Sequence, residues 1–244
     1  MIAEDILIDS LEQLKINFNE KHVIKINKYL NIVDEFNKKI NLIGTKGKQE
    51  ILIRHFIDCL SIFQYLNKNY IKRSPALKIL DIGTGAGLPG ILLAIIMENE
   101  NFYLLDKKEK VIKFLIKIKS ELELNNVEIL FGEAENFAHN PCYREIFDLV
   151  LARAVGKFNV ACELMLPFCK IKGKAIFYKS KKVLNEIENY SSTISILGGD
   201  IEGLFELNVP YLEEYRVLLV INKVKSTLYK YPRKYAKILK TPLL

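Results

Sequence analysis

A run of acids and glycines in the middle of the chain is suited to hold a nucleoside. The segment LKILDIGTGAGLPGILLA, residues 77–94, places Asp81, Gly83, Gly85 and Gly87 at alternate positions after an apolar stretch. A strand that turns sharply into a helix leaves backbone N–H groups free, and glycines remove the Cβ atoms that would block a ligand. The loop therefore predicts a ligand site, with a plain tight turn as the alternative.

The identity of the ligand depends on the neighbouring acids. Gly85, Gly87 and Gly90 fit the G-x-G-x-x-G pattern of dinucleotide folds. Asp106 follows Gly87 by about 20 positions, the spacing at which an acid binds ribose hydroxyls, although it is equally compatible with a solvated turn. Asp81 favours an S-adenosylmethionine site, because a negative charge beside the loop repels a pyrophosphate and tolerates a cationic sulfonium.

Two later positions could complete such a site. In GEAENF, residues 132–137, Glu135 could meet an adenine amino group while Ala134 supplies a backbone N–H, although a solvated loop residue is the simpler alternative. Arg153 directly follows an apolar stretch, where a guanidinium needs a partner. Asp148 or a carboxylate of the cofactor are the expected partners.

The composition predicts a globular cytoplasmic protein. Half of the 244 residues are apolar, which is enough for a sizeable core, and the formal net charge of +7 suits a polyanionic partner. Cys59, Cys142, Cys162 and Cys169 form no C-x-x-C pair, so we expect neither a metal site nor a disulfide framework. No signal pattern or bilayer-length apolar stretch is present in the sequence, so we expect no membrane partner.

Apolar periodicity divides the chain near residue 70. Residues 1–70 show helical spacing and predict a helical N-terminal extension packed on the part that carries the glycine loop, residues 71–244. In the latter, short apolar runs alternate with amphipathic segments, which predicts an α/β fold with a mostly parallel sheet between helices. The expected strands are 77–82, 102–105, 127–131, 147–152, 174–178 and two later ones, the last at 215–221. One expected helix begins near residue 89, and three others span residues 108–124, 159–166 and 182–194.

Four segments together resemble the bacterial small-subunit rRNA (guanine-N7) methyltransferase G family, also called glucose-inhibited division protein B. NLIG with IRHFIDCL is similar to its N-L-T…R-H-[IL]-x-D-S segment, and LDIGTGAGLPGI to its cofactor loop. LLDKKEKVIKFL is similar to its second strand and helix, and FDLVLARAV to its F-D-x-[IV]-x-[SA]-R-A segment. Two departures stand out: Ser180 follows Lys179 where a glycine is common, and the ending YPRKYAKILKTPLL lacks the usual glycine.

The resemblance implies a class I (Rossmann-like) S-adenosylmethionine-dependent methyltransferase with a seven-stranded sheet. The implied substrate is N7 of a guanine in the decoding-region loop of 16S rRNA, within the small ribosomal subunit. The cofactor residues that the family and the general class I pattern imply are Asp81, Gly83, Gly85, Gly87, Leu88, Asp106, Ala134, Glu135 and Arg153.

Methyl transfer to guanine N7 needs no general base, because this nitrogen carries a free lone pair and no proton. Catalysis can then rest on in-line positioning. Asp58 is our candidate for stabilising the displaced positive charge, and Arg54, His55 and Lys179 are candidates for holding phosphate or the guanine edge. The structural alternatives are a salt bridge between Arg54 and Asp58, four residues apart on a helix, and a buried structural histidine.

The ending of the chain is basic and aromatic. It predicts either contacts with RNA phosphates and unpaired bases or a solvated terminus. Its members are Lys223, Lys225, Tyr229, Lys230, Tyr231, Arg233, Lys234, Tyr235, Lys237 and Lys240. Two rival functions stay open at this point, a nicotinamide-dependent oxidoreductase and a non-catalytic RNA-binding protein. We expect a monomer, because no heptad seam is present in the sequence.

Overall fold

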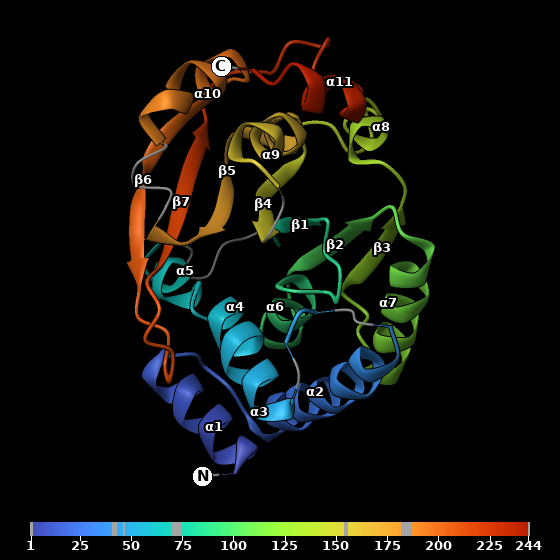
Figure 1. Ribbon diagram of the computed structural model, residues 1–244, viewed down its shortest axis with the longest axis vertical. Coiled ribbons are helices and arrows are strands. Elements are labelled where there is room, and N and C mark those ends of the chain that lie inside the picture. The colour runs from blue at the N-terminus through green and yellow to red at the C-terminus, as the bar shows by residue number, and fades with distance from the viewer. Residues whose placement is uncertain are drawn as a thin grey trace.

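The chain folds around one seven-stranded sheet (Figure 1). The computed structural model describes residues 2–40, 43–45, 47–69, 75–153, 156–181 and 187–243. The strands lie in the order β3-β2-β1-β4-β5-β7-β6. Strands β1 to β5 are parallel, and β7 runs antiparallel to both of its neighbours. The strands are β1 (Lys78–Ile82), β2 (Asn101–Asp106), β3 (Val127–Phe131), β4 (Phe147–Arg153), β5 (Cys169–Lys179), β6 (Gly199–Leu207) and β7 (Arg216–Lys223).

Helices precede the sheet and connect its strands. Those before the sheet are α1 (Ala3–Gln13), α2 (Glu20–Ile40), α3 (Lys48–Ile51), the π-helical turn η1 (Leu52–Ile57), α4 (Asp58–Leu60) and α5 (Phe63–Asn69). Those between and after the strands are α6 (Gly90–Ile96), α7 (Glu109–Glu121), α8 (Ala134–Ala138), α9 (Phe158–Met165), η2 (Leu166–Phe168), η4 (Ile187–Tyr190), α10 (Ser191–Ile196) and α11 (Tyr235–Lys240). Among the described residues, no helix combines the length and the apolar character that a membrane crossing requires.

Side chains of the central strands alternate between two hydrophobic cores. Leu149 and Leu151 of β4 belong to a cluster shared with α1, α2, α6 and α7, whereas Val150 and Ala152 belong to a cluster shared with α9 and α10. Successive side chains of a strand point to opposite faces of a sheet. The near-continuous apolar sequence of these strands therefore follows from burial on both faces.

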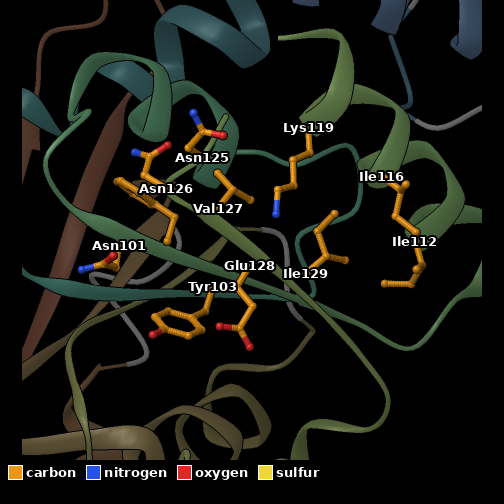
Figure 2. Close-up of a pocket in the computed structure, with 11 residues that line it drawn as sticks. Asn101, Tyr103, Ile112, Ile116, Lys119, Asn125, Asn126, Val127, Glu128 and Ile129 are labelled. Atoms are coloured by element: carbon orange, nitrogen blue, oxygen red, sulfur yellow. The ribbon is translucent and has the colours of Figure 1, made fainter. Parts of the chain in front are cut away.

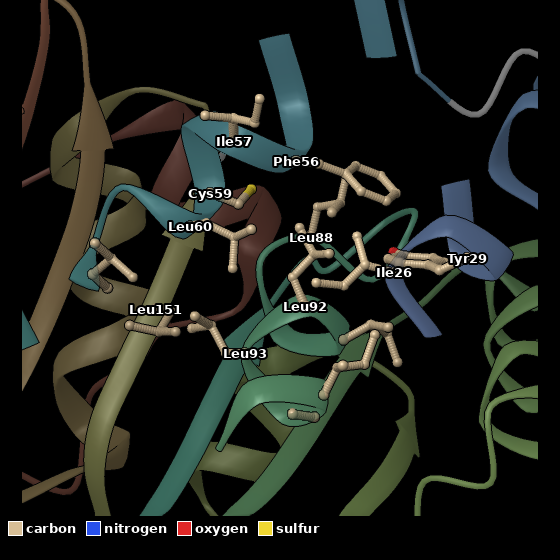
Figure 3. Packing of buried hydrophobic residues seen from close by; sticks show 14 of the residues in the cluster. Ile26, Tyr29, Phe56, Ile57, Cys59, Leu60, Leu88, Leu92, Leu93 and Leu151 are labelled. Carbon is tan, nitrogen blue, oxygen red and sulfur yellow. The ribbon is translucent and has the colours of Figure 1, made fainter. Parts of the chain in front are cut away.

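The N-terminal helices pack on the face of the sheet to which Leu149 and Leu151 point, and they contact the glycine loop. Figure 3 shows Tyr29 of α2 beside Phe56, with ring centroids 4.8 Å apart, and Leu88 of the loop in the same cluster. The Tyr29 hydroxyl donates a hydrogen bond to the carbonyl of Ala86. A side chain more than 50 residues upstream thus fixes the backbone of the loop.

Most expected elements are confirmed, with differences at their ends. Strand β5 starts at Cys169, five residues before the expected start, because its first residues lie beside Phe147 at the start of β4. A short helix, α8, replaces the expected loop around Glu135. The expected helix 182–194 is only partly described: 182–186 lie outside the described residues, and the rest divides into η4 and α10.

Candidate cofactor and substrate site

The glycine loop makes a sharp turn at the carboxyl end of β1. Gly83, Gly85 and Gly87 have φ angles of 66°, 55° and 86°, a region that side chains with a Cβ rarely adopt. The N–H of Gly85 donates to Oδ2 of Asp106 at 3.1 Å, and the N–H of Lys108 donates to Oδ1 at 2.9 Å. The carboxylate of Asp106 is therefore held against the loop, as its spacing from the glycines predicts.

Asp81 is a buried carboxylate beneath the same loop. Its Oδ2 accepts the Thr84 hydroxyl at 2.6 Å and the N–H of Gly90 at 2.9 Å, while Oδ1 has no partner among the described residues. Burial raises the pKa of Asp81 from 3.8 to about 6, and these two hydrogen bonds partly oppose the rise. A Cβ on Gly90 would lie 2.2 Å from the Leu104 side chain, so this third glycine serves packing.

A cavity of about 270 Å³ opens at the carboxyl ends of β1, β2 and β3. Four of the expected cofactor residues line it: Gly83, Asp106, Ala134 and Glu135. Their donors and acceptors suit an adenosine group, because Asp106 can accept from ribose hydroxyls and Glu135 from the adenine amino group. Asp81 does not line the cavity, but its unpartnered oxygen is buried beneath the adjoining loop, where a negative charge suits a cationic ligand.

Other expected cofactor residues lie outside this lining. Leu88 is buried in the core between α2 and α6 (Figure 3), so only its backbone could face a cofactor. A Cβ on Gly87 would clash with Ile91. The expectation that Arg153 pairs with Asp148 is wrong: Asp148 binds Lys170 and the N–H of Lys78.

The guanidinium of Arg153 instead binds Asp58 from the N-terminal part of the chain. Nη2 and Nε of Arg153 lie 2.9 and 3.2 Å from Oδ2 of Asp58. Nε of Arg216, at the start of β7, lies 3.2 Å from Oδ1 of the same carboxylate. The Asp58 side chain is only 3% exposed, so two arginines neutralise a buried charge between α4 and two strands of the sheet.

His55 completes this buried group. Its Nδ1 faces the guanidinium of Arg153 at 3.1 Å, and its Nε2 lies 2.8 Å from the Thr45 hydroxyl. Since arginine only donates, Nδ1 accepts and the ring proton lies on Nε2. Burial and then Arg153 lower the pKa of His55 from 6.5 to about 4, so the ring is neutral at pH 7. These contacts are those of a structural histidine, the alternative that the sequence offered for His55.

Arg54 points to the surface, where it pairs with acids other than the one expected. Its guanidinium lies 3.2 Å from Glu50 and 2.6 Å from Glu214, which precedes β7. The expected salt bridge between Arg54 and Asp58 is therefore not formed, since each of the two residues binds other partners. Both residues lie at the π-helical turn η1 and the start of α4, where Arg54 is half exposed and Asp58 is buried.

Lys179 lies at the end of β5 beside a second cavity. This cavity, about 1050 Å³, shares Gly156 with the cofactor cavity and is lined by Phe158 and Tyr190. The ammonium of Lys179 lies 5.3 Å from the Phe158 ring centroid. The second cavity therefore combines cationic and aromatic groups next to the cofactor cavity.

A third cavity, of about 590 Å³, lies at the opposite end of the sheet. Figure 2 shows it between the amino ends of β2 and β3, lined by Asn101, Asn126 and Val127, and the side of α7, represented by Ile112 and Ile116. Ligands of parallel sheets bind beyond the carboxyl ends of the strands. This cavity is thus remote from the candidate site.

The basic ending is partly folded into the protein, which corrects the prediction that all its cations face RNA or solvent. Lys223 is buried and pairs with Glu145 at 3.1 Å. Arg233 pairs with Glu163 at 2.6 Å. Both cations satisfy buried or half-buried acids, so neither is available to a phosphate. Sequence reasoning also missed Tyr29, Arg216 and Tyr235, because only the fold brings them to the site.

Comparisons with known proteins agree with this geometry. The family model described as rRNA small subunit methyltransferase G matches residues 22–213. Ribosomal RNA small subunit methyltransferase G of Clostridium tetani is 37% identical over 239 residues, or 98% of each chain. The protein of that name from Clostridium botulinum (strain ATCC 19397 / Type A) is 38% identical over 242 residues, again 98% of each chain.

A solved structure supports the fold independently. A SAM dependent methyltransferase from Aquifex aeolicus matches with a TM-score of 0.52 at 20% identity, over 72% of this chain and 93% of that one. The class I sheet is confirmed, and the antiparallel β7 between β5 and β6 differs from the all-parallel order of dinucleotide-binding dehydrogenases. The resemblance drawn from the sequence is confirmed, and the chain belongs to the rRNA small subunit methyltransferase G family.

Proposed function

We propose that this protein transfers a methyl group from S-adenosylmethionine to N7 of a guanine in the decoding-region loop of 16S rRNA. The observation that carries the proposal is the cavity at the carboxyl ends of β1 to β3, where a glycine loop, Asp106 and Glu135 converge in a chain of this family. A nicotinamide cofactor fits less well, because its pyrophosphate would approach the buried charge of Asp81.

The chain's own residues bind and orient the donor. S-adenosylmethionine, when bound, supplies an electrophilic methyl group on a positively charged sulfur. Asp106 accepts from the ribose, and Glu135 accepts from the adenine amino group. Asp81 contributes charge from below the loop without direct exposure.

Orientation of the guanine is the remaining task, since N7 needs no base. The second cavity adjoins the cofactor cavity at Gly156 and offers the half-buried Tyr190 for stacking and Lys179 for phosphate. We assign a positioning role to Asp58 and to the residues that contact it, because both carboxylate oxygens of Asp58 are engaged by arginines. Arg54, whose side chain is at the surface, can contact the RNA backbone only if Glu50 or Glu214 releases it.

The remaining proposals concern organisation and place of action. Residues 1–70 form the helical extension and residues 71–244 the catalytic part, with the two joined through the common core described above. A ribosomal substrate places the reaction in the cytoplasm. That the protein acts as a monomer stays a prediction.

The proposal is tested with small ribosomal subunits that lack the methyl mark. Incubation with methyl-labelled S-adenosylmethionine should label 16S rRNA, and reduction followed by aniline should cleave the RNA at the labelled guanine, which is diagnostic of N7 methylation. Labelling of protein, or of RNA at a position that aniline does not cleave, contradicts the proposal. Subunits that already carry the mark serve as the control.

A thermal-shift comparison separates the rival functions. A ligand that binds only the folded state raises the melting temperature, and S-adenosylhomocysteine should do so where NAD and NADP do not. A protein that binds the donor and rRNA but transfers no methyl group would instead be the non-catalytic RNA-binding protein.

A further inference from the structure

The segment after β7 is attached to α9 through a buried acid. Glu163 of α9 is fully buried, and Arg233 binds it with Nε at 2.8 Å, Nη2 at 2.6 Å and its backbone N–H at 2.9 Å. Ile238 of α11 is also fully buried and packs on Val160 and Leu164 of α9. The segment is therefore a folded part of the protein rather than a free basic tail.

This attachment brings Tyr235 to the cofactor cavity. Tyr235 lines the cavity together with Gly83, Asp106 and Glu135. Its backbone N–H donates to Oε1 of Glu135 at 2.9 Å, and its ring centroid lies 4.7 Å from the ammonium of Lys107. Figure 1 shows α11 beside α8, in agreement with this hydrogen bond.

Given the proposed function, we propose that Tyr235 forms part of the adenine-binding wall of the cofactor site. Oε1 of Glu135 is used by the backbone of Tyr235, which leaves Oε2 to accept from the adenine amino group. Glu135 holds the backbone of Tyr235, and the Lys107 ammonium lies over its ring. Among the described residues that line this cavity, Tyr235 is the aromatic one, so its ring is the surface against which a base can stack. Stacking of a base on an aromatic side chain is tolerant of base type and adds to affinity.

Tyr235 lies beyond the region that the family model matches. The family model covers residues 22–213, so α11 lies outside the matched region. In the sequence, Tyr235 follows YPRK, where the ending departs from the family pattern. The segment therefore contributes to cofactor binding through contacts that the family motifs do not include.

The first experiment measures equilibrium binding of S-adenosylhomocysteine and of adenosine by calorimetry. Tyr235→Ala should weaken both ligands about tenfold and by similar factors, because the lost contact is with the base. Tyr235→Phe should bind as the wild type does. Tyr229→Ala, in the same segment but 70% exposed, is the matched control and should also bind normally.

A second experiment remains informative if Tyr235→Ala unfolds. The chain has no tryptophan, so Tyr235→Trp creates a single fluorescent reporter at the proposed wall. Adenosine should quench its emission with saturation, whereas the emission of Tyr229→Trp should stay constant. Equal responses of the two variants, or wild-type affinity in Tyr235→Ala, would overturn the inference about Tyr235. Failure of the wild type itself to bind S-adenosylhomocysteine would instead overturn the proposed function.

Discussion

Replacing Asp81 by asparagine should show separately how far the buried charge lowers the stability of the fold and how far it contributes to ligand binding. The pKa of Asp81 is raised from 3.8 to about 6, chiefly by burial, so the ionised form is costly in the folded protein. The difference of about two pKa units corresponds to about 3 kcal/mol, at 1.36 kcal/mol per unit. At neutral pH the wild type carries this cost, and the variant does not.

The pH dependence of unfolding gives the sign of the effect. Between pH 4 and pH 6 the folded state binds more protons at Asp81 than the unfolded state, so the contribution of this group to stability rises as pH falls. From pH 7.5 to pH 5 the wild type should gain about 1.4 kcal/mol relative to Asp81→Asn, as two-state linkage with pKa values of 6 and 3.8 requires. Urea unfolding of both proteins at pH 5, 6 and 7.5 measures this change, and titratable groups that do not interact with Asp81 cancel in the comparison.

Ligand binding supplies the second half of the test. Asp81→Asn should weaken S-adenosylmethionine, because it removes the attraction between the carboxylate and a cationic ligand; a loss of about 1.4 kcal/mol appears as a tenfold rise in Kd. Adenosine, which lacks the cationic portion, should bind as before. Parallel stability curves of the two proteins from pH 7.5 to pH 5, or equal losses for both ligands, would refute this account of Asp81.

Three further predictions concern packing and charge around the site. Gly90→Ala should lower stability by about 1–3 kcal/mol, because its Cβ would lie 2.2 Å from a Leu104 methyl group, whereas Gly44→Ala, with nothing within 4 Å, should be nearly neutral in the same denaturant titration. Asp58→Ala should cost about 3–5 kcal/mol in thermal or chemical unfolding, since it leaves two partly buried guanidinium groups without their carboxylate. Arg54→Ala should change stability by less than about 1 kcal/mol, because both of its ion pairs are exposed. It should raise the KM for ribosomal subunits and leave the Kd for S-adenosylhomocysteine unchanged. A change in that Kd counts against an RNA-facing role.

The sequence by itself determined the elements that depend on local patterns. The period of apolar residues predicts the strands of the parallel sheet, and glycines at alternate positions predict the turn after β1. The spacing from Gly87 to Asp106 places an acid at the end of β2, since strands of a βαβ unit end at the same edge of the sheet. These predictions succeed because each rests on residues that are close together in the chain.

Only the tertiary structure decided which distant residues meet. Arg54 pairs with Glu214, whereas Asp58 lies between Arg153 and Arg216. No periodicity reveals such a pairing, because each partner comes from a different element and a buried charge takes whichever counterion the fold brings within reach. The sequence groups Tyr235 with the basic ending, whereas the packing of α11 on α9 brings this residue to the cofactor cavity. Its contacts depend on packing between segments about 100 residues apart, information that a local sequence pattern does not contain.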